Sequence, residues 1–256
     1  MTSRGERIAG AFGDARAYDA HAVVQRRVAA RLARRIAALP EGERRRVLEL
    51  GCGTGFLAAA LPPLPPGGDW LMTDIAPAML ERSRARFAGR DGFRFALLDA
   101  AAPAFAGREA PFDLICSSLA LQWLDDLPGA LERLFRLLRP GGRLLIATLA
   151  EGTFAEWRAA HADLGLVAGT PEYPAPATLR AIRLDGTAGT IEMARFTCRY
   201  PDAAHFLRAV KAIGAGTPRP GHIPLDAATM RAVLRRFDRR GREVSYHVAF
   251  CAFTRP

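Results

Sequence analysis

The stretch that decides the fold is Val47-Leu48-Glu49-Leu50-Gly51-Cys52-Gly53-Thr54-Gly55. Its first four residues form a short apolar run that predicts a strand, and residues 56–61 after it predict a helix. Glycines between a strand and a helix permit a sharp turn and let backbone N–H groups approach a ligand closely. A dinucleotide-binding loop has the pattern Gly-x-Gly-x-x-Gly, and here the third glycine comes one residue too early. The stretch therefore favours a nucleotide-type ligand other than a dinucleotide.

Strand-like and helix-like segments alternate after this loop. The segments that predict strands are residues 70–73, 93–98, 112–117 and 143–149. The segments that predict helices are residues 77–87 and 128–138. Such alternation implies an α/β fold, with a parallel sheet and helices on both of its faces.

Both ends of the chain extend this core. Residues 24–39 predict an amphipathic helix that ends at Pro40, because apolar side chains recur there at every fourth position. The elements expected after Ala150 are helices at 153–164, 203–213 and 227–237 and strands at 190–199 and 244–253. We expect one domain that consists of an N-terminal lid (1–45), a ligand-binding core (46–150) and a C-terminal cap with closing strands (151–256).

Three acids follow or end successive predicted strands, namely Glu49, Asp74 and Asp99. The carboxyl ends of parallel strands meet at one edge of the sheet, so these side chains are expected to surround one ligand. A carboxylate at Glu49 would repel a pyrophosphate and suits a ligand with an ammonium group. Asp74 can accept hydrogen bonds from two ribose hydroxyls, and Asp99 with Ala100 lies where an adenine amino group would need an acceptor. The set predicts an adenosine-containing, positively charged ligand.

The composition limits the other function classes. No apolar run is long enough to span a bilayer, and the N-terminus lacks a signal-peptide pattern, so we expect a cytoplasmic protein. The four cysteines have no metal-ligand spacing, and we expect no metal. The net charge of +10 is concentrated in residues 1–46 and 208–242, which favours an acidic partner. No motif typical of nucleic-acid binding accompanies these basic flanks.

The core motifs resemble those of class I S-adenosylmethionine-dependent methyltransferases. The resemblance rests on residues 49–55, Thr73-Asp74-Ile75, Leu98-Asp99-Ala100 and Leu138-Arg139-Pro140-Gly141-Gly142. It implies a Rossmann-like, seven-stranded and mostly parallel sheet with an antiparallel final strand, which residues 244–253 would supply. It also implies S-adenosylmethionine as the cofactor and S-adenosylhomocysteine as its product.

Both ends of the chain resemble the malonyl-acyl carrier protein O-methyltransferases of biotin synthesis. The matching segments are residues 8–13, 18–26, 117–123, 148–153, 210–215 and 245–247. Residues 178–190 and 217–222 match this family only loosely. The resemblance implies methylation of the free malonyl carboxylate, on acyl carrier protein or on coenzyme A, with the acidic carrier as partner and neither nucleic acid nor membrane.

The resemblance also implies roles for individual residues. The expected cofactor-binding residues are Gln25, Glu49, Gly51, Cys52, Gly53, Gly55, Asp74, Ile75, Met79, Asp99, Ala100 and Ser117. Tyr18 and Gln122 are the expected catalytic residues, with Tyr18 closing over the cofactor. The expected substrate-binding residues are His21, Trp123, Arg208 and Lys211. The two cations are candidates because recognition of a carboxylate favours a positive charge.

Three alternatives remain open at the level of sequence. One is another carboxylate or quinone methyltransferase, of the trans-aconitate type. A second is a relative of mitochondrial assembly factors that act as protein-arginine hydroxylases and share residues 118–124 and 126–128. The third is a cofactor-binding scaffold without catalysis, against which the intact Glu49, Asp74 and Asp99 argue.

Overall fold

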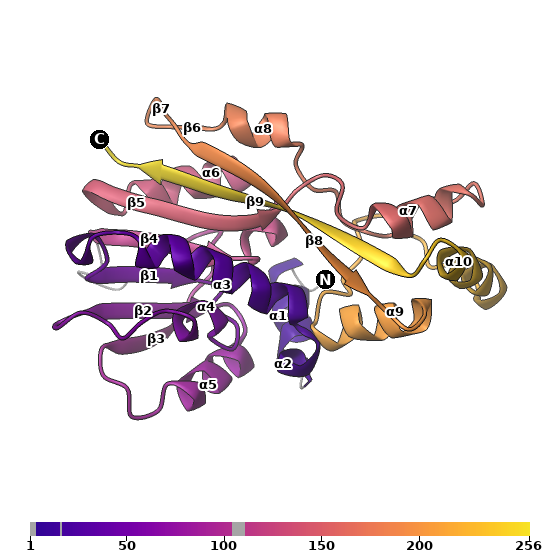
Figure 1. Ribbon diagram of the computed structural model, residues 1–256, viewed down its shortest axis with the longest axis horizontal. Coiled ribbons are helices and arrows are strands. Elements are labelled where there is room, and N and C mark those ends of the chain that lie inside the picture. The colour runs from indigo at the N-terminus through magenta and orange to yellow at the C-terminus, as the bar shows by residue number, and fades with distance from the viewer. Residues whose placement is uncertain (1–3, 16, 104–110) are drawn as a thin grey trace.

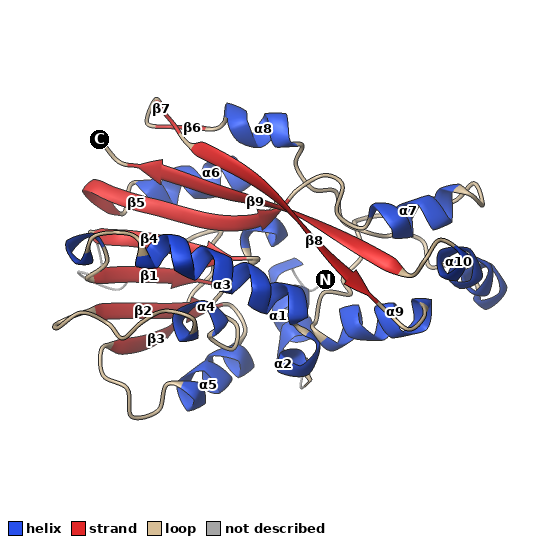
Figure 2. Cartoon of the chain, in the orientation of Figure 1, coloured by secondary structure: helices blue, strands red, loops and turns tan. Residues whose placement is uncertain are grey.

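The computed structural model describes residues 4–15, 17–103 and 111–256. Its centre is a seven-stranded sheet with the order β3-β2-β1-β4-β5-β9-β8 (Figure 2). The strands are β1 (Arg46–Leu50), β2 (Asp69–Asp74), β3 (Phe93–Leu97), β4 (Phe112–Ser118), β5 (Leu138–Leu149), β8 (Thr190–Arg199) and β9 (Glu243–Thr254). Neighbours from β3 to β5 pair in parallel, and β9 pairs antiparallel with both β5 and β8. The expected mostly parallel sheet with an antiparallel closing strand is confirmed.

Helices cover both faces of the sheet because successive strand residues point to opposite sides. On β1, Val47 packs into the cluster that contains the buried side of α3, whereas Leu48 and Leu50 pack into the cluster that contains α6. The first face is covered by α3 (Val23–Ala37), α4 (Phe56–Ala59) and α5 (Pro77–Arg86). The second is covered by α6 (Leu127–Phe135) and α8 (Pro176–Ala181). The side chain at position 49 therefore belongs to the α3 side.

The two ends of the chain meet beyond the carboxyl edge of the parallel strands. The N-terminal elements there are α1 (Arg4–Gly13) and α2 (Tyr18–His21). The C-terminal ones are α7 (Ala155–Ala162), α9 (Ala203–Ala212) and α10 (Ala227–Arg239), which we call the cap. Figure 1 shows the long strands β8 and β9 reaching past the other strands into the cap, with α1 and α2 between the cap and α5. This arrangement encloses the space above the glycine loop.

Two parts of the structure differ from the sequence prediction. Strand β5 begins at Leu138, before the Pro140-Gly141-Gly142 segment, because Leu138 already pairs with Phe112 and the register then shifts. Residues 178–189, for which the sequence predicts no element, contain the end of α8 and a hairpin of β6 (Arg183–Leu184) and β7 (Thr187–Ala188). In the part of the chain that the structure describes, no helix is long and apolar enough to cross a membrane.

Candidate active site

The glycine loop between β1 and α4 has the backbone geometry that its sequence predicts. Gly51, Gly53 and Gly55 have φ values of +61°, +55° and +85°, in the left-handed region that favours glycine. A Cβ on Gly51 would lie 2.2 Å from the Cβ of Ala120, so this glycine is required by packing. A Cβ on Gly53 would instead project into open space, with the Tyr18 hydroxyl at 3.9 Å as its nearest neighbour. Gly53 therefore leaves room for a ligand.

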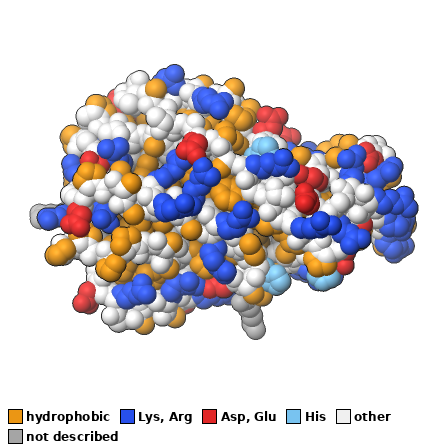
Figure 3. Space-filling view, in the orientation of Figure 1, with side chains coloured by type: hydrophobic (Ala, Val, Ile, Leu, Met, Phe, Trp, Pro, Cys, Tyr) orange, Lys and Arg blue, Asp and Glu red, His pale blue; other side chains and the backbone are white. Residues whose placement is uncertain are grey.

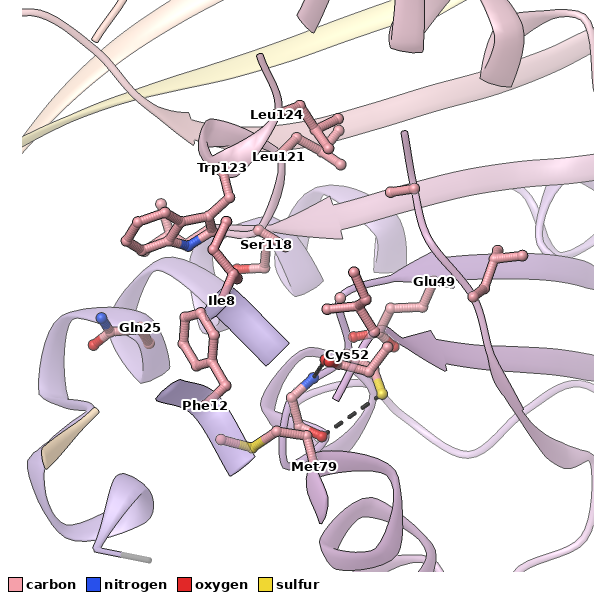
Figure 4. Close-up of a pocket in the computed structure, with 18 of the residues that line it drawn as sticks. Ile8, Phe12, Gln25, Glu49, Cys52, Met79, Ser118, Leu121, Trp123 and Leu124 are labelled. Atoms are coloured by element: carbon pink, nitrogen blue, oxygen red, sulfur yellow. Dashed lines mark hydrogen bonds between the residues drawn. The ribbon is translucent and has the colours of Figure 1, made fainter. Parts of the chain in front are cut away.

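A cavity of about 410 Å3 lies above this loop, between the sheet edge and α1 (Figure 4). Its acidic lining residues are Glu49, Asp74, Asp99 and Asp125. Among the described residues that line it there is no Arg, Lys or His. A pyrophosphate would meet several carboxylates and no cation here, whereas a ligand with an ammonium or sulfonium group would be stabilised. The chemistry of this lining fits S-adenosylmethionine and does not fit a dinucleotide.

Glu49 is the most deeply buried of these acids, with 1% of its surface exposed. Its Oε2 accepts a hydrogen bond of 2.9 Å from the Trp70 indole nitrogen on β2. Burial raises the pKa of the Glu49 carboxyl to about 8, and the Asp74 charge acts in the same direction against the Trp70 hydrogen bond. A cationic ligand would reverse much of this shift, because it stabilises the ionised carboxylate.

Asp74, the last residue of β2, connects the glycine loop to the start of α5. Its Oδ2 accepts a hydrogen bond from the Gly53 N–H at 2.8 Å, and its Oδ1 accepts one from the Ala76 N–H at 2.9 Å. Burial raises the pKa of this carboxyl in spite of the backbone donors. A carboxylate has about four acceptor sites, so Asp74 can still accept hydrogen bonds from a ligand.

Aromatic side chains from α1 and α2 form the outer wall of the cavity. Figure 4 shows Ile8 and Phe12 on the same side of the cavity as Trp123. The rings of Phe12 and Trp123 meet edge to face with centroids 5.8 Å apart, and the Tyr18 ring stacks on Phe56 at 6.0 Å. Burial raises the pKa of Tyr18 above its usual value, and the Asp74 charge adds to this. Tyr18 therefore stays a neutral hydrogen-bond donor over the physiological pH range.

Polar contacts that the sequence does not predict connect the N-terminal segment of this wall to the glycine loop and to α5. The Asp19 carboxylate accepts a hydrogen bond of 2.6 Å from the Thr54 hydroxyl in the glycine loop and forms an ion pair with Arg86 on α5. Arg82, one turn earlier on α5, donates to the Ala15 carbonyl at 2.6 Å. Among the acidic residues, the sequence analysis assigns a site role only to those at strand ends, and Asp19, which lies next to Tyr18, is not one of them.

Most residues expected from the sequence line this cavity. They are Tyr18, Gln25, Glu49, Gly51, Cys52, Gly53, Asp74, Ile75, Met79, Asp99, Ala100 and Trp123. The expected site residues that do not line it are Gly55, Ser117, Gln122, His21, Arg208 and Lys211. The lining residues that the sequence did not identify include Ile8, Phe12, Thr54, Phe56, Ser118 and Asp125.

Two of the expected residues that do not line the cavity, Ser117 and Gln122, form hydrogen bonds to nearby backbone carbonyls instead. The Ser117 hydroxyl donates to the Leu50 carbonyl at 2.9 Å inside the sheet, and the next residue, Ser118, lines the cavity instead. The Gln122 amide nitrogen donates to the Leu119 carbonyl at 2.6 Å, so its side chain folds back on its own turn. His21 is exposed at the end of α2. The expected roles of these residues therefore lack support from the geometry.

A second cavity of about 900 Å3 lies on the other side of α1, within the cap. Its large apolar lining residues are Phe154, Trp157, Phe206, Leu207, Val210, Leu225 and Met230. Its described ionisable lining residues are Asp14, His161, Lys211 and His222. Ile8 and Phe12 of α1 line the first cavity, while Ala11 lines the second, so one helix separates the two spaces.

Gly214 fixes the position of that separating helix. Its φ is +72°, and a Cβ there would lie 2.8 Å from the Ala11 carbonyl oxygen and 2.9 Å from the Phe12 Cα. The segment after α9 therefore contacts the backbone of α1 directly, at the residues that divide the two cavities. Of the two expected cations, Lys211 lines the second cavity and Arg208 lines neither.

No group of three or more His, Cys, Asp or Glu side chains among residues 4–15, 17–103 and 111–256 is arranged to hold a metal ion. All four cysteines, at positions 52, 116, 198 and 251, are free.

Comparison with known proteins agrees with this geometry. Residues 48–144 match the model of a methyltransferase domain. The YcgJ protein from Bacillus subtilis superposes with a TM-score of 0.60 at 17% identity, covering 89% of this chain and 97% of that one. A putative methyltransferase from Bacillus halodurans superposes with a TM-score of 0.59 at 14% identity, covering 89% and 98%. The fold and the acid-lined cavity define a class I methyltransferase, dependent on S-adenosylmethionine.

Curated relatives give the family. A malonyl-[acyl-carrier protein] O-methyltransferase from Magnetococcus marinus is 41% identical over 99% of this chain and 94% of its own length. The biotin biosynthesis bifunctional protein BioCD from Bordetella avium is 47% identical over 93% of this chain. The aligned part is 50% of that bifunctional relative, so this chain spans about half of its length. The chain belongs to the malonyl-[acyl-carrier protein] O-methyltransferase family.

Proposed function

We propose that this chain transfers the methyl group of S-adenosylmethionine to the free carboxylate of a malonyl group carried by acyl carrier protein, in the early part of biotin synthesis. The observation that carries this proposal is the extent of the similarity to the Magnetococcus relative, which covers 99% of the chain. It therefore includes α1, α2 and the cap, which line the two cavities, as well as the generic cofactor-binding core. We further propose that the enzyme is cytoplasmic and needs no metal.

The cofactor is proposed to bind in the acid-lined cavity. When bound, S-adenosylmethionine supplies a methyl group made electrophilic by its positively charged sulfur. Glu49 would pair with the ammonium group, Asp74 would accept hydrogen bonds from the ribose hydroxyls, and Asp99 would lie near the adenine. The open space at Gly53 and the absence of cations among the described lining residues support this assignment.

The acceptor needs alignment and a dry environment more than acid or base catalysis. A malonyl carboxylate is already ionised at neutral pH, so no general base is required for its attack on the methyl carbon. Tyr18, a half-buried neutral donor, would orient the carboxylate by one hydrogen bond. Phe12 and Trp123 would exclude water from the reacting atoms, since their rings close the outer wall of the cavity.

The second cavity is proposed to receive the thioester side of the acceptor. The acceptor would pass the C-terminal end of α1 to reach the cofactor, since Asp14 lines the second cavity and Tyr18 lines the first. Its wall is largely apolar, which suits the uncharged part of the arm next to the malonyl thioester. Lys211 supplies the positive charge in its lining, whereas Arg208 is exposed and outside it. We therefore retain Lys211 as a substrate-binding residue and assign no contact to Arg208.

Genetic complementation tests the proposal. The chain should restore growth without biotin to a bacterial strain that lacks its malonyl-carrier methyltransferase, and a variant with Asp74→Ala should not. Failure of the wild-type chain, when it is expressed in folded form and binds S-adenosylmethionine, would contradict the proposed acceptor. It would then favour another carboxylate as substrate.

A further inference from the structure

Helix α10 contains two groups of arginines with different surroundings. Arg236 and Arg240 lie on the side that faces α7, where both form ion pairs with Asp163 at 3.3 Å and 2.7 Å. The apolar side of the helix buries Val233 and Phe237 in the core. This side and the Asp163 ion pairs hold α10 against the rest of the cap.

The other arginines of α10 form an exposed stripe. Arg231, Arg235 and Arg239 follow each other at intervals of four residues, which places them on one face of the helix. All three are exposed, and no ion pair in the described part of the chain involves them. Like charges at this spacing destabilise a helix, so helix stability does not account for the stripe. In Figure 3 basic side chains gather at the end of the molecule where α10 lies.

This basic stripe starts beside the second cavity. Met230, immediately before Arg231, lines that cavity, as does Leu225 just ahead of the helix. The side chains of Val167 and Ile223 are 69% and 81% exposed, although both are large and apolar. Each lies within two residues of a residue that lines the same cavity, Gly169 or His222.

The two exposed apolar side chains belong to loops that contact each other. The Arg219 N–H donates to the Gly169 carbonyl at 2.9 Å. The His222 ring lies so close to Gly169 that a Cβ there would be 2.7 Å from it. Exposed apolar side chains and a row of charges without ion pairs thus both adjoin residues that line one cavity. This is the composition of a protein-docking surface, with apolar contacts surrounded by a charged rim.

We propose that Arg231, Arg235, Arg239, Val167 and Ile223 form the docking surface for the acidic carrier protein, with its thioester arm directed into the second cavity. This inference rests on the proposed function and assigns the partner of that site to one surface. Charge complementarity favours the carrier, since an acidic protein surface would neutralise the stripe and speed association. The stripe begins at Arg231, next to Met230 in the lining of the cavity, so a carrier bound along it would hold its arm near this cavity.

The test compares two triple variants with the same change in net charge. The stripe variant is Arg231→Ala with Arg235→Ala and Arg239→Ala. The control is Arg34→Ala with Arg90→Ala and Arg180→Ala, three exposed arginines on α3, after α5 and on α8. Initial rates are measured with malonyl-acyl carrier protein and with malonyl-N-acetylcysteamine, a thioester that lacks both carrier and phosphate. Circular dichroism checks that both variants are folded.

The stripe variant should raise the KM for malonyl-acyl carrier protein about tenfold or more at low salt, leave kcat unchanged and lose most of its salt dependence. Its KM for the small thioester should stay within twofold of the wild-type value, and the control should behave as wild type with both substrates. A separate variant, Ile223→Ser, should raise the KM for the carrier substrate alone.

Three outcomes would overturn the inference. Equal losses in the stripe variant and the control would show a general effect of net charge. A second outcome is a wild-type enzyme that is active on malonyl-acyl carrier protein and a stripe variant whose KM for this substrate is unchanged. It would show that the carrier does not dock on the stripe, and it would leave the proposed function intact. A wild-type enzyme that methylates the small thioester and not the carrier substrate would overturn the docking surface together with the proposed carrier partner.

Discussion

The indole nitrogen of Trp70 donates a hydrogen bond of 2.9 Å to the carboxylate of Glu49, and both side chains are buried. This is the polar contact that holds Glu49 at the floor of the acid-lined cavity. It also opposes the effect of burial, which raises the pKa of Glu49 to about 8. The pair therefore links cofactor binding to pH.

Cofactor affinity should rise with pH up to about the pKa of Glu49. Below pH 8 the Glu49 carboxyl is mostly protonated in the free protein, with a pKa of about 8, and it must ionise to pair with an ammonium group. Binding then releases a proton, so the association constant for S-adenosylmethionine should increase about tenfold per pH unit between roughly pH 6 and 7.5 and level off above pH 8. Isothermal titration calorimetry in buffers of different ionisation enthalpy measures both the affinity and the proton release.

Two variants check that this dependence belongs to Glu49. Glu49→Gln keeps an oxygen for the Trp70 donor but has no ionisation, so its affinity should be lower and independent of pH in this range. Trp70→Phe removes a donor that lowers the Glu49 pKa, so the midpoint should move to higher pH. A wild-type affinity that does not change between pH 6 and pH 8 would contradict the pairing.

Tyr18→Phe should impair methyl transfer without loosening the cofactor. The phenyl ring keeps the stacking on Phe56, whereas the hydroxyl that would orient the acceptor is lost. A hydrogen bond to a charged group contributes about 1.5–3 kcal/mol, so kcat/KM for the acceptor should fall roughly 10- to 100-fold. The dissociation constant for S-adenosylmethionine should change by less than about threefold. A large loss of cofactor affinity with normal acceptor kinetics would instead make Tyr18 a lid residue alone.

Gly214→Ala should destabilise the enzyme and disturb both cavities. Its Cβ would lie 2.8 Å from the Ala11 carbonyl oxygen, and the residue would be strained at a φ of +72°. Gly165→Ala is the matched control, because Gly165 has a φ of +69° and nothing within 4 Å of its Cβ position. We expect the free energy of unfolding to fall by about 1–2 kcal/mol in the control and by a further 1–3 kcal/mol in Gly214→Ala. Equal losses in denaturant titrations would show that contact with α1 is unimportant.

Lys211→Ala and Arg208→Ala should differ, although both residues belong to α9. Lys211 lines the second cavity, and Arg208 lines neither. Because Lys211 is partly solvated, its loss should raise the KM for a malonyl thioester roughly twofold to fivefold, with kcat and cofactor affinity preserved. Arg208→Ala should match the wild type in steady-state assays. The reverse pattern would mean that the acceptor binds elsewhere.

Much of the fold follows from the sequence because its core is regular. Glu49 and Asp74 occupy adjacent parallel strands, and alternation of strand and helix fixes their common edge. The hairpin at 183–188 also has a sequence pattern typical of a turn, since Asp185-Gly186 is a turn dipeptide and both residues have positive φ. It was missed because its strands are only two residues long.

The rest of the site depends on contacts between distant segments, which periodicity does not describe. Ser117 and Ser118 are neighbours on one buried strand, and only the packing of the sheet decides which hydroxyl reaches the cavity. In the same way, the residues next to Asp19 in the sequence do not indicate its partners, because Thr54 and Arg86 come from the glycine loop and α5. The choice between Lys211 and Arg208 required the position of the whole cap.

Mass spectrometry of malonyl-acyl carrier protein, after incubation with the enzyme and S-adenosylmethionine, measures the proposed methyl transfer itself. The carrier should gain the mass of one methyl group in place of a proton, and fragmentation of the malonyl-bearing arm in the mass spectrometer should locate the added mass on the malonyl group. Acetyl-acyl carrier protein, which lacks the free carboxylate, should remain unmodified. If the malonyl carrier stays unmodified in the presence of folded, cofactor-binding enzyme, the chain does not methylate this acceptor.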